Sequence, residues 1–128
     1  MKRMMMLLAA LLLCLAGLSA SAEGSMYYTL GSQVDDFTVT TYDGRSVSLY
    51  ETLKEKDMVL LNIWASWCGP CKMEFPFMQE AYARYQDQME VIAVSCEAAD
   101  DDEVLRAFAG ERGLTFPVAR DTANLALR

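Results

Sequence analysis

The chain has 128 residues, enough for one domain, which excludes a large multidomain protein. Its formal net charge of −7 argues against nucleic acid and against anionic membrane surfaces as partners. It contains no histidine, so the commonest metal ligand and the usual catalytic base are both missing. Of its four cysteines, three lie after residue 22, which is too few and too irregular for a disulfide scaffold, and we expect no cofactor and no metal site.

Residues 1–22 are predicted to be a secretory signal peptide. Lys2 and Arg3 form a short positive start, residues 4–18 are almost wholly apolar, and Ala20-Ser21-Ala22 has the small-x-small pattern of a cleavage site. The apolar run is shorter than the roughly 20 residues that span a bilayer. We therefore expect cleavage, no stable membrane insertion afterwards, and an exported protein in the periplasm or at the cell-envelope exterior. The alternative is a membrane anchor that stays uncleaved.

Cys14 raises the possibility of a lipoprotein, in which a lipid-modified cysteine becomes the new N-terminus. Such a cysteine normally follows a small residue, whereas Leu13 precedes this one. A cysteine inside a disposable signal is the preferred interpretation. Residues 23–30 are predicted to be a linker, and residues 31–128 form the predicted domain.

The first predicted element of the domain is a β-hairpin. Apolar and polar side chains alternate over residues 37–42, Asp43-Gly44 is a turn signal, and residues 47–49 resume an extended pattern. One helical turn is expected at residues 49–54. The next strand, at residues 58–65, is almost continuously apolar, which predicts burial on both of its faces.

A helix is predicted to follow this strand, and a second strand and helix come after it. Apolar residues at helical spacing predict the core-facing side of the first helix. They are Met73, Phe77, Met78, Ala81, Tyr82 and Tyr85. Residues 89–96 form the next strand, Asp100 and Glu103 resemble a capping box, and residues 116–119 form a short strand. This order predicts an α/β domain with a central, partly parallel sheet flanked by helices.

The motif Trp67-Cys68-Gly69-Pro70-Cys71 lies between the apolar strand and the predicted helix. A helix N-terminus offers unpaired N–H groups and a partial positive charge, which stabilise a thiolate and lower the pKa of a cysteine. The thiolate is the attacking species in disulfide exchange. We therefore predict that Cys68 is the exposed nucleophile, and that Cys71, one helical turn deeper, resolves the mixed disulfide. Gly69 leaves the approach open, and Pro70 preorganises the first helical turn.

Other interpretations of the cysteines stay open. The pair could be half of a zinc site, but a structural zinc needs about four protein ligands and only Cys96 remains after residue 22. The pair could also be a structural disulfide, although its loop is too short to stabilise much. Cys96 is expected to be a buried, inert thiol, and the alternative is a third redox cysteine that exchanges with the pair.

The stretch from Asn62 to Cys71, followed by Glu74-Phe75-Pro76, resembles the thioredoxin superfamily. Within it, the chain is most similar to the exported TlpA/ResA-like branch, which is grouped with redoxin and AhpC/TSA domains. The likeness covers residues 31–128. It implies a thioredoxin-like fold with an N-terminal hairpin. It also implies a protein that exchanges disulfides with protein thiols and receives electrons from a membrane donor. It also implies that Trp67 shapes the partner-facing surface, to which we also assign Gly69 and Pro70.

The same resemblance suggests a third catalytic residue. Cytoplasmic thioredoxins have a proton-moving Asp at the position of Asn62, a role that Asn cannot fill. We predict that Glu74 is partly buried near Cys71 with a raised pKa, the alternative being a solvent-facing glutamate. The family's cis-proline loop, its last two strands and its last helix have no counterpart before Arg128, so we expect an incomplete domain whose sheet lacks an edge hairpin.

These observations predict a thiol–disulfide oxidoreductase that acts on protein disulfides outside the cytoplasm. Gly-Pro between the cysteines favours a reductant, by resemblance to thioredoxin. Three alternatives stay open: a thioredoxin-fold peroxidase of the AhpC/TSA type, a metal-binding module, and an inactive truncated fragment. The Pro-x-x-x-Thr-x-x-Cys stretch of peroxiredoxins does not occur in the sequence, nor does the distal histidine of Sco-type copper proteins.

Overall fold

The computed structural model describes residues 30–127. The predicted signal peptide with Cys14, and residues 23–29 of the predicted linker, lie outside these described residues. Within residues 30–127, no helix has both the length and the apolar character needed to cross a membrane.

The predicted β-hairpin is confirmed. Strands β1 (Thr38–Thr40) and β2 (Ser46–Ser48) pair antiparallel. Gly44 lies in the connecting turn with a φ of +86°, a left-handed conformation that favours glycine. The expected helical turn is helix α2 (Leu49–Thr52), and the hydroxyl of Ser48 caps it by accepting a hydrogen bond from the Glu51 amide.

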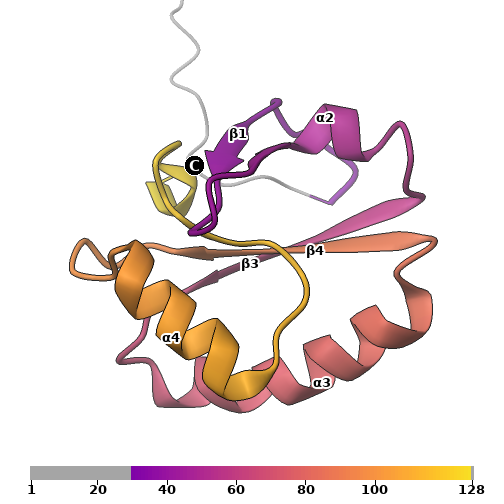
Figure 1. The fold of residues 1–128 in the computed structure, drawn as a ribbon. Coiled ribbons are helices and arrows are strands. Elements are labelled where there is room, and N and C mark those ends of the chain that lie inside the picture. The colour runs from indigo at the N-terminus through magenta and orange to yellow at the C-terminus, as the bar shows by residue number, and fades with distance from the viewer. Residues whose placement is uncertain (1–29, 128) are drawn as a thin grey trace, which may run out of the picture.

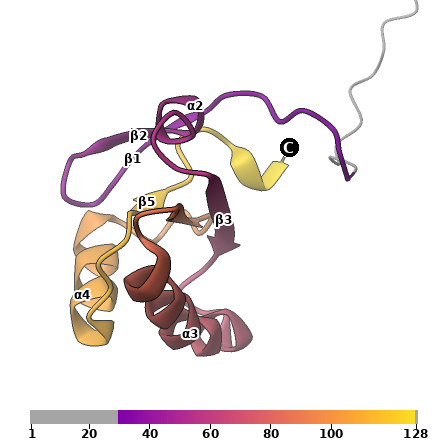
Figure 2. The same cartoon turned by 90° about the vertical axis from the view of Figure 1, so that its right-hand side faces the viewer.

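The main sheet contains β3, β4 and β5 in this order, with both pairs parallel. Its strands are Met58–Trp64, Met89–Ser95 and Val118–Arg120. The helices that follow are α3 (Gly69–Tyr85), α4 (Asp102–Arg112) and the short 3-10 helix η1 (Leu125–Leu127). Helices α3 and α4 cover one face of the sheet, and the hairpin with α2 covers the other (Figures 1 and 2). The predicted α/β architecture is therefore confirmed.

Strand β4 is the centre of the core because side chains on both of its faces are buried. Val91 and Ala93 belong to the cluster beneath α3 and α4, whereas Ile92 and Val94 belong to the cluster beneath the hairpin. All four are fully buried. This alternation follows from the two-residue period of a strand with a covered layer on each side.

The expectation that β3 is buried on both faces is wrong for much of the strand. Met58 is 57% exposed, and Leu60 and Leu61 are each 38% exposed. In the part of the chain that the structure describes, β3 pairs with β4 alone, so its other edge is open. Only at its end does the strand become fully buried, at Trp64.

The predicted core-facing side of α3 is wrong in part. Phe75 is fully buried and lies edge-on to the ring of Trp64, with 4.8 Å between ring centroids. Met78 is buried as predicted. The exposed members of the predicted stripe are Met73, Phe77 and Tyr85. The side of the helix that carries Phe75 therefore faces the core, and the side that carries Phe77 faces solvent.

The predicted capping box of Asp100 and Glu103 is wrong, because the residue after Asp100 caps α4. The N-cap is Asp101, whose Oδ1 accepts hydrogen bonds from the amides of Glu103 at 3.0 Å and Val104 at 2.9 Å. Asp100 does not cap the helix. Its side chain turns inward and is buried. The contacts of this carboxylate are therefore not those of a helix cap.

Candidate redox site

Cys68 and Cys71 lie at the start of α3 and form a disulfide, with 5.3 Å between their Cα atoms. Cys68 is the N-cap residue of the helix, and its Sγ accepts a hydrogen bond from the Cys71 amide at 3.3 Å. Gly69 and Pro70 are the first two helical residues. The sulfur of Cys68 therefore lies at the positive end of the helix and accepts the Cys71 amide, an environment that stabilises a thiolate.

The two cysteines differ in what they contact. Both are half-buried, but Cys71 packs against the core cluster beneath α3 and α4. Trp67, Gly69 and Pro70 are exposed, Trp67 at 72%. The accessible side of the motif is thus formed by the three residues that the sequence analysis assigned to the partner-facing surface.

Two carboxylates from the loop after β4 hold the segment that precedes Cys68. Oε2 of Glu97 accepts a 2.8 Å hydrogen bond from the indole Nε1 of Trp67, and Oδ2 of Asp100 accepts a 2.9 Å bond from the Ser66 amide. The Ala99 amide, and next the Trp67 indole, lower the pKa of Glu97 by hydrogen bonding to its ionised form. Sequence reasoning missed both contacts, although the carboxyl ends of parallel strands meet at one edge of a sheet.

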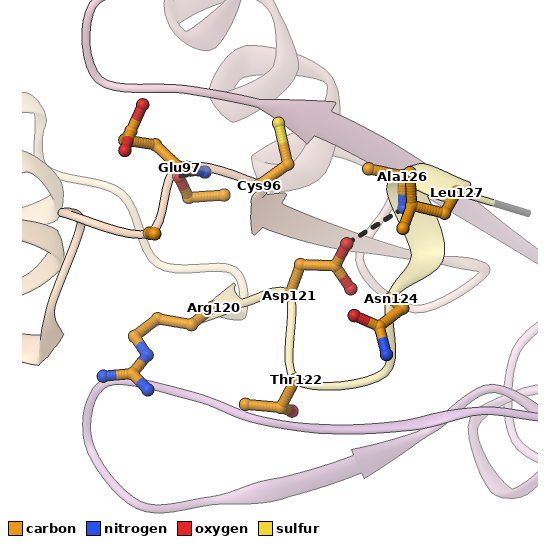
Figure 3. Close-up of a pocket in the computed structure, with 10 residues that line it drawn as sticks. Cys96, Glu97, Arg120, Asp121, Thr122, Asn124, Ala126 and Leu127 are labelled. Atoms are coloured by element: carbon orange, nitrogen blue, oxygen red, sulfur yellow. Dashed lines mark hydrogen bonds between the residues drawn. The ribbon is translucent and has the colours of Figure 1, made fainter.

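The expectation of a buried Cys96 is wrong, because this free cysteine is exposed. Its thiol donates a hydrogen bond to the Trp64 carbonyl at 3.3 Å. Cys96 lines a pocket of about 490 Å³ where β4 and β5 end, together with Glu97, Arg120 and Asp121 (Figure 3). The pocket is therefore adjacent, through Glu97 and its bond to Trp67, to the segment before Cys68.

The predicted burial of Glu74 is also wrong, because its side chain is exposed on α3. The desolvation that was expected to act on this carboxylate is therefore absent. Asn62, at the position of the proton-moving Asp of cytoplasmic thioredoxins, is half-buried, and its Oδ1 is buried without a hydrogen-bond partner among the described residues. The structure thus brings Cys68, Cys71 and Trp67 together at one surface and leaves Glu74 in solvent.

A disulfide-forming Cys-x-x-Cys pair at the N-terminus of a helix, after a parallel strand in a sheet covered on both faces, defines a thioredoxin-like redox protein. Residues 30–128 match the AhpC/TSA family, and the chain belongs to this family as a ResA-like redoxin.

Several known proteins share this sequence and fold. The chain is 41% identical over 96 residues to thioredoxin-like protein YneN of Bacillus subtilis, a match that covers 74% of this chain and 55% of YneN. It is 33% identical over 132 residues to thiol-disulfide oxidoreductase ResA of Geobacillus thermodenitrificans, covering 98% of this chain and 74% of that protein. The chain spans about half the length of YneN and of several other ResA proteins.

The fold is also similar to that of a solved structure from Chlorobium tepidum, assigned as thiol:disulfide interchange protein DsbE. The TM-score is 0.63 and the sequence identity 32%, with 77% of this chain and 67% of that chain covered. The resemblance to the thioredoxin superfamily is therefore confirmed in both sequence and fold.

Proposed function

We propose that the chain is a thiol–disulfide oxidoreductase that reduces disulfides of partner proteins outside the cytoplasm. The observation that carries this proposal is the position of Cys68, whose sulfur caps α3 within a disulfide to Cys71 and next to exposed Trp67. Relatives named thiol-disulfide oxidoreductase support the same chemistry.

The reaction begins with the reduced pair. The Cys68 thiolate attacks one sulfur of a partner disulfide, so a bond forms between Cys68 and that sulfur while the partner's S–S bond breaks. The second partner sulfur leaves as a thiolate and takes up a proton. The positive end of α3 and the Cys71 amide stabilise the charge on Cys68 before the attack.

The second step returns the pair to the oxidised state seen in the structure. The Cys71 thiolate attacks Sγ of Cys68, forms the intramolecular disulfide and releases the remaining partner thiolate. Two electrons have then passed from the dithiol to the partner. Because Cys71 packs against the core, the attack comes from the protein side of the mixed disulfide.

The location and the partners are parts of the same proposal. Residues 1–22 would direct export and residues 31–128 would form the redox domain, with residues 23–30 as the linker between them. An extracytoplasmic reductant must be reduced again after each turnover, and we propose that an electron donor at the membrane does this. The partners are protein thiols and disulfides.

The test is a set of cysteine variants in a protein-disulfide reduction assay. We expect Cys68→Ser to abolish reduction and Cys71→Ser to accumulate a mixed disulfide with the partner. A potential near ~−270 mV for the wild-type pair would support a reductant, whereas one near ~−120 mV would mean an oxidant. Consumption of hydrogen peroxide without reduction of protein disulfides would instead support the peroxidase alternative.

A further inference from the structure

Asp100 is a buried carboxylate that the proposed exchange steps do not use. Its side chain is 2% exposed. One oxygen, Oδ2, accepts a hydrogen bond from the Ser66 amide at 2.9 Å and another from the hydroxyl of Ser95. A buried carboxylate is costly unless it is hydrogen-bonded, so these contacts fix its position.

The two donors belong to different parts of the site. Ser95 is the last residue of β4, the central strand, and is itself buried. Ser66 lies in the loop between β3 and Cys68, where the Cys68 amide also donates a 3.0 Å bond to the Ala65 carbonyl. Asp100 therefore connects the rigid centre of the sheet to the backbone two residues before the nucleophile.

We infer that Asp100 is a positioning residue for disulfide exchange, acting through its hydrogen bond to the Ser66 amide. The inference rests on the proposed function. With Ser66 held, the sulfur of Cys68 keeps its place at the start of α3, within reach of the Cys71 amide. Without the acceptor, the Ser66 N–H loses its partner and the loop before Cys68 gains freedom. Misplacement of a reacting atom lowers the rate because exchange needs the three sulfurs in line.

The experiment compares a variant that removes the hydrogen-bond acceptor of the Ser66 amide with a variant that keeps it. Asp100→Ala removes it, whereas Asp100→Asn keeps a side-chain carbonyl oxygen in the same place. We expect Ala to lower the second-order rate constant for reduction of a protein disulfide about tenfold, the effect of one hydrogen bond to a charged group. We expect Asn to stay within about threefold of the wild type, since a neutral acceptor recovers most of that bond.

Asp102→Ala is the matched control. It removes the same side chain two residues away, from the exposed first turn of α4, where Asp102 contributes only a weak interaction with the helix dipole. Its rate should equal that of the wild type. Thermal unfolding of each variant shows whether the chain is folded, and amide hydrogen exchange at Ser66 should quicken with Ala and stay slow with Asn.

If Asp100→Ala does not fold, Asp100→Ser replaces it, because the serine hydroxyl keeps a polar group in the buried site but is one bond too short to take the place of Oδ2, which accepts the Ser66 amide. A folded Ala or Ser variant with the wild-type rate overturns the inference. An Asn variant as slow as Ala also overturns it, since the charge rather than the bond would then matter. A wild-type chain that reduces no disulfide refutes the proposed function instead, and exchange at Ser66 still tests the contact.

Discussion

The indole nitrogen of Trp67 donates a 2.8 Å hydrogen bond to Oε2 of Glu97, the second residue after β4. Trp67 is 72% exposed, so packing alone does not orient its ring. The bond to Glu97 therefore fixes an aromatic side chain directly beside Cys68. Because Glu97 is ionisable, we expect this bond to weaken when its carboxylate is protonated.

The first prediction concerns the effect of low pH on the hydrogen bond between Trp67 and Glu97. Hydrogen bonds from the Ala99 amide and the Trp67 indole lower the pKa of Glu97 below its usual 4.5. This stabilisation is present above that usual value and is lost as the pH falls through the lower pKa of the folded state. We expect a change in tryptophan fluorescence as the pH falls below that usual value of 4.5, once the carboxylate takes up its proton. Glu97→Gln should remove the change, and a step that persists in Glu97→Gln would contradict this assignment.

The second prediction compares two phenylalanines of α3. Phe75 is fully buried against Trp64, whereas Phe77 is 73% exposed. We expect Phe75→Ala to lower the free energy of unfolding by about 3–5 kcal/mol. Phe77→Ala should change it by no more than about 0.5 kcal/mol. Urea unfolding measures both, and equal losses would show that the helix faces the core differently.

The third prediction concerns Cys96. Because this thiol is free and exposed, iodoacetamide should label it in the native, oxidised protein, while the disulfide protects Cys68 and Cys71. Peptide mass spectrometry identifies the labelled residue. Cys96→Ser should reduce protein disulfides at the wild-type rate, because neither exchange step needs a third thiol. Labelling of Cys96 only after denaturation would contradict its exposure.

The fourth prediction tests Glu74, which we retain as a proposed tuning residue despite its exposure. Its carboxylate lies on α3, three residues after Cys71, where a negative charge disfavours a nearby thiolate. We expect Glu74→Gln to move thiolate formation to lower pH by less than about one pH unit, because solvent screens an exposed charge. Absorbance of the thiolate at different pH values measures this. Glu80→Gln is the control, and no difference between the two variants would remove Glu74 from the site.

Local signals made the redox motif and the hairpin predictable. The motif at residues 67–71 and the turn at Asp43-Gly44 each depend on a few adjacent residues, and the structure places both as expected. Asp100 was harder to place because three aspartates follow one another at residues 100–102. Any of them could cap α4, and only the tertiary contact with Ser66 shows that Asp100 turns inward.

The orientation of α3 was undetermined for a similar reason. Phe75, Met78 and Tyr82 recur at helical spacing, and so do Phe77, Ala81 and Tyr85. Periodicity alone cannot decide between two apolar stripes on one helix. The aromatic cluster around Trp64 decides it, because Phe75 and Phe108 both pack on that indole ring.

The open edge of strand β3 is a place where the described part of the chain can associate with another strand. Its seven residues pair on one side with β4, and the other edge presents backbone N–H and C=O groups beside exposed Leu60 and Leu61. An open edge with apolar side chains is a template on which another strand can add. Preparations of a chain with this edge uncovered should therefore lose monomer as their concentration rises, and storage conditions would decide how much of the redox-active form survives.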